Sequence, residues 1–267
     1  MKIAIHSVFI AKENILFLEE WIDYHIQLGV DYFYLYDNSN VEKVVGFNAP
    51  KKFMIAGKIN KYNIDFDKIV NMTNEEVNNV LLNIQSKYKC VNIIEWSPKD
   101  KDGKIVHFQQ KAHADCLNRL KETNVDWCVS IDIDEFIVLK DKGLKEYINS
   151  LDPLIYGFMI SQYRFDRRFN NLNKLVTQVN KTSEITHDIS HSPKYIYNVQ
   201  KTDTVSIHSC NGKGNILKTN LDGIWFNHYN TDFSNPETKY KELKNMNPDI
   251  LSVIEKNSKN YILKHYE

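Results

Sequence analysis

The chain has 267 residues, with 34 basic and 34 acidic side chains and a formal net charge of zero. This length suits one large domain or two small ones, and it can bury a sizeable core. The balanced charge argues against a general polyanion-binding surface, so nucleic acid is not an expected partner. No apolar run approaches the ~20 residues of a membrane span, and none of the nine glycines forms a phosphate-binding loop.

The N-terminal residues predict a strand, a helix and a second strand. Residues 2–9 are apolar but too soon interrupted for a signal peptide, so a strand is expected. An amphipathic helix follows and ends at Gly29, a typical helix stop. Packing positions of this helix include Trp21, Tyr24 and His25. Residues 32–36 form a strand closed by the turn formers 37–40. The short crossover predicts a βαβ unit with parallel strands.

Alternating helices and strands are expected along the rest of the chain. The helices are at 65–87, 108–122 and 142–150, with two more in 236–265; the strands are at 89–95, up to Asp132, and near 155–164. Region 165–225 is mixed and polar, with weak periodicity. No repeat or linker interrupts this order, so we expect a single α/β domain over residues 1–267. The cysteines are expected to be free thiols: Cys90, Cys116, Cys128 and Cys210.

Alternating carboxylates follow the apolar run that begins at Trp127. Asp132 and Asp134 are two residues apart, so on an extended backbone they lie on one side of the strand. Paired carboxylates repel each other, and a divalent cation removes the conflict. Hard oxygen ligands suit magnesium or manganese. At the carboxyl end of a strand in an α/β sheet, where ligands bind, this pattern predicts a metal site.

Three ordered segments of the chain resemble glycosyltransferase family 92, within the nucleotide-sugar-binding GT-A fold. The first comprises Lys12-Glu13-Asn14, Glu20-Trp21-Ile22, Tyr24-His25 and Tyr36-Asp37-Asn38-Ser39. The second comprises Gln109, Asp115-Cys116-Leu117 and Asp132-Ile133-Asp134-Glu135-Phe136, and the third is Asn227-His228-Tyr229. The resemblance implies a Rossmann-like mixed sheet, mostly parallel and flanked by helices. It also implies a nucleotide-sugar-binding half at 1–136, and an acceptor-binding half with C-terminal helices at 137–267.

The family resemblance further implies a metal-dependent, inverting transfer of a hexose from a UDP-sugar to a glycan or other hydroxyl acceptor. UDP and galactose are expected from the resemblance alone. Mn²⁺ or Mg²⁺, held by Asp132, Asp134 and His228, would stabilise the charge that grows on the departing diphosphate. His208 competes with His228 for this role, or contacts phosphate. The family that this chain resembles usually reads Lys-Asn-Glu where this chain has Lys12-Glu13-Asn14, so the resemblance implies that either Glu13 or Asn14 takes the acidic role.

Donor-binding residues are expected on several elements. They are Lys12, Glu13, Asn14, Asp37, Gln109, Asp115, Ile133 and His208. Asp37 follows a strand, where its carboxylate can accept hydrogen bonds from a base or a ribose; a turn-capping role is the alternative. Gln109 and Asp115 are six residues apart on one helix, so they do not share a face and only one or two side chains of this helix can reach the donor.

Inversion requires a base that takes the proton of the acceptor hydroxyl. Asp166 is the leading candidate because it follows a predicted strand, although its arginine neighbours equally suit a surface ion pair. Glu184 and Asp188 are alternatives. The basic residues of this region could engage diphosphate or an anionic acceptor: Arg164, Arg167, Arg168 and Lys194.

Two other classes of protein also fit parts of the sequence. A nucleotidyltransferase joins metal and nucleotide, although no glycine-rich activating loop follows the first strand. A non-catalytic nucleotide-sugar-binding protein would bind the same ligands without transfer. We expect a soluble, cytoplasmic protein without a transmembrane segment, with action at a membrane surface left open. The sequence does not predict the oligomeric state.

Overall fold

The computed structural model describes residues 1–40, 58–59, 64–65, 72–165, 182–186, 193–219 and 223–228. The helices are α1 (Ala11–Leu28), α3 (Asn74–Lys87), α4 (Gln109–Lys121) and α5 (Leu144–Asn149). The strands are β1 (Ile3–Phe9), β2 (Tyr32–Asp37), β3 (Lys58–Ile59), β4 (Ile64–Asp65), β5 (Val91–Glu95), β6 (Trp127–Ser130), β7 (Glu135–Leu139), β8 (Ile155–Phe165), β9 (Thr182–Thr186), β10 (Lys194–Asn198), β11 (Thr202–Ser206), β12 (Ser209–Gly212), β13 (Asn215–Lys218) and β14 (Ile224–His228).

The chain opens with the expected βαβ unit. β1 pairs in parallel with β2, from Ala4 opposite Tyr32 to Phe9 opposite Asp37. Between them, α1 ends where Gly29 adopts a left-handed conformation at φ 102° and donates its N–H to the last turn of the helix. A side chain at this φ would be strained, so glycine suits the position. The predicted helix stop is confirmed.

A ten-stranded mixed sheet forms the centre of the molecule, in the order β5-β2-β1-β6-β10-β8-β14-β7, with β9 and β13 also paired to β8. The four strands from β5 to β6 run parallel. β10 is antiparallel to both of its neighbours, β6 and β8, so it joins the parallel part to the second half of the sheet. The predicted mixed α/β sheet is confirmed, and the parallel pairing of β1 with β2 and β6 places the carboxyl ends of these three strands along one edge.

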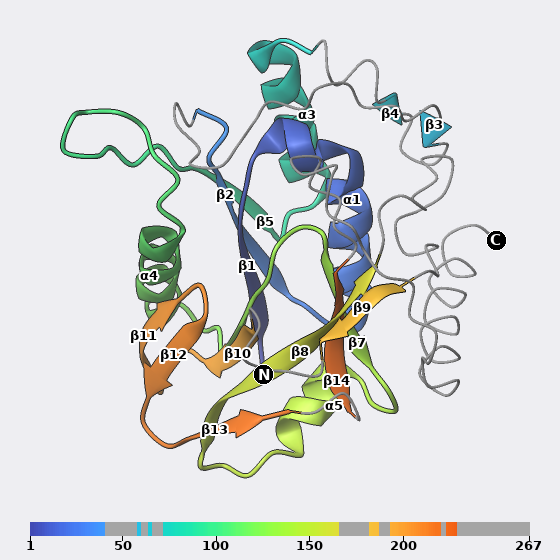
Figure 1. The fold of residues 1–267 in the computed structure, drawn as a ribbon, viewed down its shortest axis with the longest axis vertical. Coiled ribbons are helices and arrows are strands. Elements are labelled where there is room, and N and C mark those ends of the chain that lie inside the picture. Colours follow the sequence, from blue (N-terminus) through green and yellow to red (C-terminus); the bar gives the residue numbers. More distant parts are fainter. Residues whose placement is uncertain are drawn as a thin grey trace.

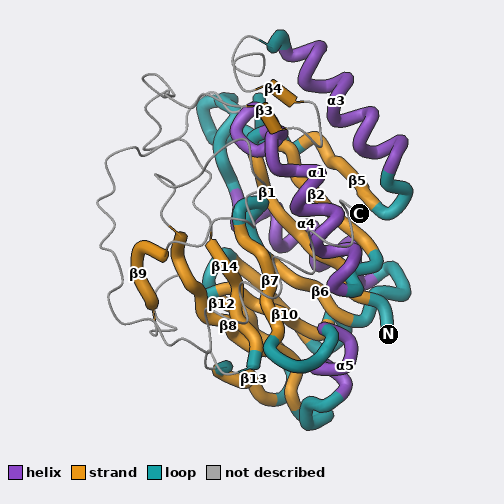
Figure 2. Tube along the Cα trace, turned by 90° about the vertical axis from the view of Figure 1, so that its right-hand side faces the viewer, coloured by secondary structure: helices purple, strands orange, loops and turns teal. Residues whose placement is uncertain are grey.

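The two faces of the sheet carry different cores. Alternate residues of β1 face opposite ways: Ile3 and Ile5 belong to a core shared with α1 and α3, whereas Ala4 and Val8 belong to a core shared with α4 and β11. This alternation is the period of two that a strand imposes on its side chains. Figure 1 shows α4 beside the β11–β12 hairpin and apart from α1 and α3, and Figure 2 shows α1 and α3 as neighbours in the view turned by 90°.

Helix α1 also acts as a partner for β7, which within the described residues pairs with β14 alone. The Trp21 indole N–H donates to the carbonyl of Glu135 at 2.8 Å, and the Tyr24 hydroxyl donates to the carbonyl of Ile137 at 2.6 Å. The N–H of Ile137 donates to Nε2 of His25 at 3.4 Å. Positions i, i+3 and i+4 share one face of a helix, so three side chains replace a neighbouring strand.

His25 performs this role as a neutral ring. Its Nδ1 lies 2.8 Å from the carbonyl of Trp21, which accepts a hydrogen bond from it, so Nε2 keeps the lone pair that accepts from Ile137. Burial lowers the pKa of His25 to about 3, which favours this neutral form. The expected packing role of Trp21, Tyr24 and His25 is confirmed: the first and last are completely buried, and all three hydrogen-bond to β7.

Several predicted boundaries shift in the structure. The helix expected from residue 65 begins at Asn74, where Thr73 and Glu76 form a capping box. A Thr–Glu pair at this spacing satisfies two backbone donors, so it starts the helix there. The strands expected near 155–164 are one long strand, β8. The helices expected in 236–265 lie outside the described residues, and the prediction of a single domain with two halves stays a prediction.

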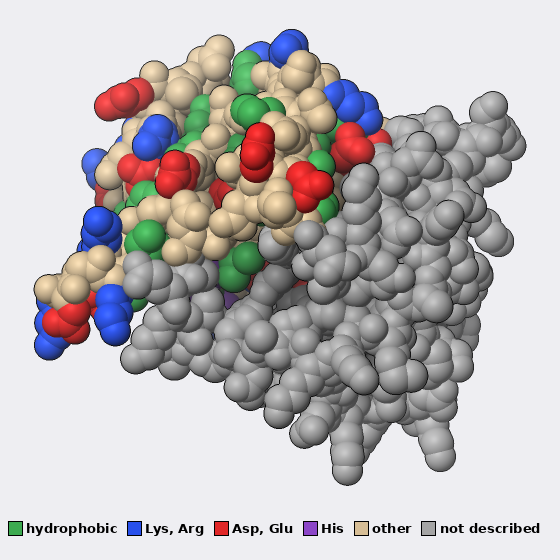
Figure 3. Space-filling model, turned by 90° about the horizontal axis from the view of Figure 1, so that it is seen from above, with side chains coloured by type: hydrophobic (Ala, Val, Ile, Leu, Met, Phe, Trp, Pro, Cys, Tyr) green, Lys and Arg blue, Asp and Glu red, His purple; other side chains and the backbone are tan. Residues whose placement is uncertain are grey.

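The remaining expectations concern thiols, membranes and charge. All four cysteines are free, and Cys116, Cys128 and Cys210 are buried. In the part of the chain that the structure describes, no helix combines the length and the apolar character needed to cross a bilayer. Among the described residues that are visible from above, acidic and basic side chains are interspersed (Figure 3), in keeping with the zero net charge of the chain.

Candidate active site

The acidic motif forms a turn between β6 and β7 rather than the end of an extended strand. β6 ends at Ser130, so the expectation that the strand continues to Asp132 is wrong. Two hydrogen bonds between Glu135 and the backbone of Asp132 stabilise the turn. The N–H of Glu135 donates to the carbonyl of Asp132 at 3.1 Å, and Oε2 of Glu135 accepts from the N–H of Asp132 at 2.9 Å. Ile131 and Ile133 are buried in the core and anchor the turn.

Asp134 and His228 meet on one side of this turn. His228 ends β14 and is in register with Glu135 of β7, which brings Nε2 of His228 to 3.2 Å from Oδ2 of Asp134. The other ring nitrogen, Nδ1, lies 2.9 Å from Oε1 of Gln162 on β8. When Nδ1 donates this hydrogen bond, a neutral ring presents the Nε2 lone pair towards the Asp134 carboxylate. A cation between the two atoms would satisfy both.

The spacing of these two atoms fits a shared metal ion. Two ligands at right angles with bonds of about 2.1 Å lie about 3 Å apart, close to the 3.2 Å observed. Imidazole nitrogen and carboxylate oxygen are both suitable ligands for manganese. Among the described residues, no group of three His, Cys, Asp or Glu side chains is arranged to hold a metal. Asp134 and His228 would therefore supply only two protein ligands to a bound metal, and a bound diphosphate would have to supply others.

Asp132 faces a different partner, the buried Lys194 of β10. The ammonium Nζ of Lys194 lies 2.6 Å from Oδ2 of Asp132 and 3.3 Å from Oε2 of Glu135. Burial lowers the pKa of Lys194, but the two carboxylates outweigh it and the net pKa is raised, so the side chain is charged. The sequence singled out Lys194 only as a contact for diphosphate or an anionic acceptor. Lys194 pairs with Asp132, which lies 62 positions earlier in the chain, so no local sequence pattern could have predicted this contact.

Glu135 lies between the two pairs and is completely enclosed. Its Oε2 contacts Lys194, while its Oε1 lies 3.7 Å from Nδ1 of His228. Burial raises the pKa of Glu135 to about 7, and Lys194 opposes that shift. The sequence assigned no role to Glu135, and the structure makes it the residue that joins the Lys194 side of the turn to the His228 side.

Histidines surround the Asp132 side of the turn. His113 of α4 lies 3.0 Å from the hydroxyl of Ser130, and burial lowers its pKa to about 4. His107 precedes α4 and makes a 2.7 Å hydrogen bond with Asn38, after β2. His208, an expected donor contact, lies in the β11–β12 turn with Nδ1 3.3 Å from the carbonyl of Pro193, the residue before Lys194. The end of β6 is therefore in contact with α4, and the segment before β10 is in contact with the β11–β12 turn.

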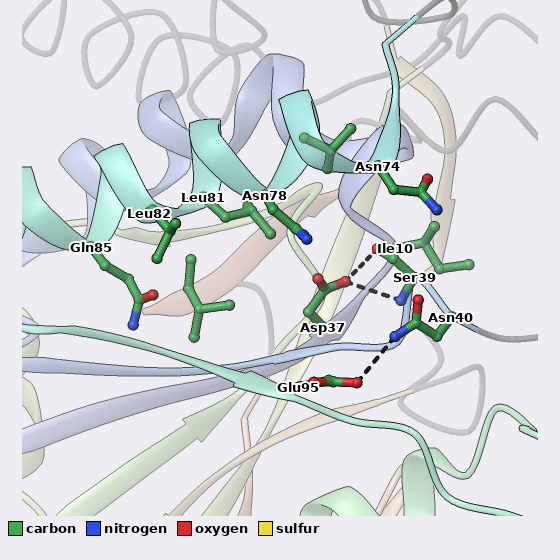
Figure 4. Close-up of a pocket in the computed structure, with 12 residues that line it drawn as sticks. Ile10, Asp37, Ser39, Asn40, Asn74, Asn78, Leu81, Leu82, Gln85 and Glu95 are labelled. Atoms are coloured by element: carbon green, nitrogen blue, oxygen red, sulfur yellow. Dashed lines mark hydrogen bonds between the residues drawn. The ribbon is translucent and has the colours of Figure 1, made fainter.

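A pocket of about 700 Å³ opens at the carboxyl ends of β2 and β5. Asp37 and Glu95 are register partners on these strands, and both line it. Figure 4 shows α3 above them, with Asn78 pointing towards Asp37; other residues of this helix also line the pocket, namely Asn74, Leu81, Leu82 and Gln85. Hydrogen bonds from Ser39 hold Asp37, and Asn40 donates to Glu95 at 3.1 Å. Burial raises the pKa of Asp37, and the bonds from Ser39 oppose this shift.

The other predicted donor residues are less closely gathered. Gln109 is the first residue of α4. Asp115 accepts hydrogen bonds from Tyr36 and Arg119, both at 2.7 Å, so its observed contacts hold α4 against β2. The side chain of Ile133 is part of the core. Asn14 donates to the carbonyl of Ile10 at 3.0 Å, in the first turn of α1.

Some predicted residues fall where the structure gives no side chain. Lys12 and Glu13 lie in the first turn of α1, but their side chains lie outside the described part, so the choice between Glu13 and Asn14 stays open. Asp166 and Asp188 also lie outside the described residues, and Glu184 is described only as part of the backbone of β9. The basic residues Arg164, Arg167 and Arg168 are not described at the side-chain level either.

Solved structures similar to this chain have low sequence identity. S. aureus TarS 1-349 has 10% identity and a TM-score of 0.43, with 86% of this chain and 60% of that chain covered. HddC from Yersinia pseudotuberculosis has 14% identity and a TM-score of 0.39, with 96% and 98% covered. The galactosyltransferase LgtC, in complex with donor and acceptor sugar analogs, has 12% identity and a TM-score of 0.30, with 75% and 59% covered.

Comparison with curated proteins gives no match. Comparison with protein families gives a match that includes the residues around the acidic turn. The model of glycosyltransferase family 92 matches residues 67–262, which include the Asp132–Glu135 turn, Lys194 and His228. This match covers well over half of the chain, and the chain belongs to glycosyltransferase family 92.

Proposed function

We propose that this protein transfers a hexose from a UDP-sugar to a hydroxyl group of a glycan or glycoconjugate, in a reaction that depends on Mn²⁺ or Mg²⁺. The observation that carries the proposal is the approach of Asp134 and His228 to 3.2 Å, on the sheet edge that also bears the Asp37 pocket. Ligands of α/β sheets bind at this edge, at the carboxyl ends of the strands.

The Asp37 pocket is the proposed site of the nucleoside. The carboxylates of Asp37 and Glu95 can accept hydrogen bonds from a base N–H or from ribose hydroxyls. The apolar side chains of Leu81 and Leu82 line the same pocket and offer contact to a ring. Two carboxylates would repel the diphosphate, so the phosphates must point away from the pocket, towards the metal ligands.

Asp134 and His228 would hold the metal, with Gln162 fixing the tautomer of His228 through Nδ1. A bound divalent cation supplies a Lewis acid that stabilises the negative charge on the leaving nucleoside diphosphate. The acceptor hydroxyl must lose a proton as it attacks the anomeric carbon, and inversion follows from a single displacement. Asp166 remains the proposed base, with Glu184 and Asp188 as alternatives.

Thermal shift with a panel of nucleotides, each with and without manganese, tests this proposal. UDP at 100 times its dissociation constant is expected to add ~2.7 kcal/mol to the free energy of unfolding, and only when manganese is present. UDP-galactose and other UDP-hexoses should then release UDP when a sugar acceptor is added. Binding without any transfer or hydrolysis would favour the non-catalytic alternative, and turnover of a sugar phosphate with a nucleoside triphosphate would favour a nucleotidyltransferase.

A further inference from the structure

Lys194 places a buried cation against the acidic turn. Only 6% of this residue is exposed, and its position is fixed by the pairing of β10 with β6 and β8 on either side. A buried ammonium is costly unless opposite charges compensate it. Asp132 at 2.6 Å and Glu135 at 3.3 Å provide that compensation. Lys194 is therefore a buried cation that is held by one buried carboxylate, Glu135, and by one partly exposed carboxylate, Asp132.

The two aspartates of the motif consequently have different partners. Oδ2 of Asp132 contacts Lys194, whereas Oδ2 of Asp134 contacts His228. Their exposure differs as well, because the Asp132 side chain is 41% exposed and that of Asp134 only 8%. A carboxylate already paired with an ammonium attracts a second cation less strongly, since the two positive charges repel each other.

Glu135 contacts both sides of the turn and fixes its Asp132 end. Its Oε2 accepts from the N–H of Asp132 and contacts Lys194, so the Asp132 end of the turn is tied to β10. Its carboxylate also carries the negative charge that helps to keep Lys194 in place. Without the ammonium, Asp132 and Glu135 would face each other uncompensated, and a metal ion would be the nearest source of positive charge.

We propose that Lys194 is a positioning residue that withholds Asp132 and Glu135 from the metal, so that Asp134 is the carboxylate ligand of this motif. The proposal rests on the proposed function, and it assigns unequal roles to two aspartates that look equivalent in the sequence. Asp132 serves as the counter-ion that orients Lys194 and the turn. Removal of the Lys194 charge releases Asp132 and makes it available as an additional ligand.

Titration of Mn²⁺ in the presence of UDP, with free Mn²⁺ measured by electron paramagnetic resonance, tests the proposal without any need for turnover. Asp132→Asn is expected to bind Mn²⁺ within threefold of the unaltered chain, and Asp134→Asn at least tenfold more weakly. The double variant Lys194→Met with Glu135→Gln removes the ammonium and one buried carboxylate together. It should bind Mn²⁺ at least threefold more tightly than the unaltered chain, whereas a simple packing defect would weaken binding.

Lys194→Arg keeps the positive charge and is the matched control, with Mn²⁺ affinity expected near that of the unaltered chain. Circular dichroism and a cooperative thermal transition confirm that each variant is folded. Equal losses in folded Asp132→Asn and Asp134→Asn would overturn the proposal for Lys194 but leave the metal-dependent function standing. Failure of the unaltered chain to bind Mn²⁺ with UDP would overturn both.

Discussion

The contact between α1 and the edge of β7 gives a sharp stability prediction. Trp21→Phe removes the indole N–H that donates to the carbonyl of Glu135 at 2.8 Å, in a side chain that is completely buried. An unsatisfied buried carbonyl costs about 1–3 kcal/mol. The smaller ring gives up about 1–2 kcal/mol of apolar burial. We expect the free energy of unfolding to fall by about 2–5 kcal/mol and the melting temperature by roughly 5–15 °C.

Urea denaturation followed by circular dichroism measures this loss, with Gln27→Ala on the exposed face of α1 as the control. Tyr24→Phe provides a second comparison, because it removes the donor to the carbonyl of Ile137 further along β7. Since Glu135 follows Asp134 directly, Trp21→Phe should also weaken Mn²⁺-dependent UDP binding more than Tyr24→Phe does. A Trp21→Phe protein as stable as the unaltered chain would refute the idea that α1 completes the edge of β7.

Three further predictions concern protonation and catalysis. Burial lowers the pKa of His25 to about 3 and that of His113 to about 4, so the unfolded chain binds protons that the folded chain does not. Their contribution to the free energy of unfolding is therefore complete above pH ~6.5 and is lost as the pH falls towards 4, by about 1.4 kcal/mol per pH unit for each ring. Denaturation curves at several pH values would measure this loss, and a free energy of unfolding that does not change with pH would contradict the prediction. His228→Ala should weaken Mn²⁺ binding in calorimetry and abolish the loss of affinity between pH 7.5 and pH 5.5, because a protonated imidazole cannot ligate a metal; an unchanged pH response would transfer the role to His208. Asp166→Asn should keep UDP-sugar affinity and lose ~10² to 10⁴ of the transfer rate, and full activity in this variant would move the base to the following residues.

Local patterns in the sequence predicted the elements that frame the site. The apolar run of β1, the glycine that ends α1 and the turn formers after β2 each specify local conformation, and the βαβ unit follows from their spacing. The end of β6 was misplaced because Glu135 redirects the backbone through its side chain, and an apolar pattern carries no trace of such a bond. Helix periodicity likewise placed Trp21, Tyr24 and His25 in the core but did not show that they hydrogen-bond to β7.

The contacts within the site could not be predicted from local sequence patterns, because they depend on strands that are far apart in the sequence. His228 reaches Asp134 because β14 pairs with β7, and the family resemblance rather than any local pattern suggested that meeting. Lys194 reaches Asp132 because β10 inserts antiparallel between β6 and β8, a register that depends on contacts far apart in the sequence. The pocket at Asp37 needed the position of α3, whose side chains complete it. Unequal partners for the two aspartates therefore emerge only from the fold.

Calorimetric titration of UDP into the unaltered chain and into Asp134→Ala, each with and without manganese, tests whether Asp134 helps to hold the metal. The unaltered chain is expected to bind UDP in a manganese-dependent manner. Asp134→Ala, with an unchanged circular dichroism spectrum, is expected to lose this manganese-dependent binding, because one of the two proposed metal ligands that meet at 3.2 Å is gone. Unaltered manganese-dependent UDP binding by a folded Asp134→Ala protein would contradict the claim that Asp134 and His228 hold the metal.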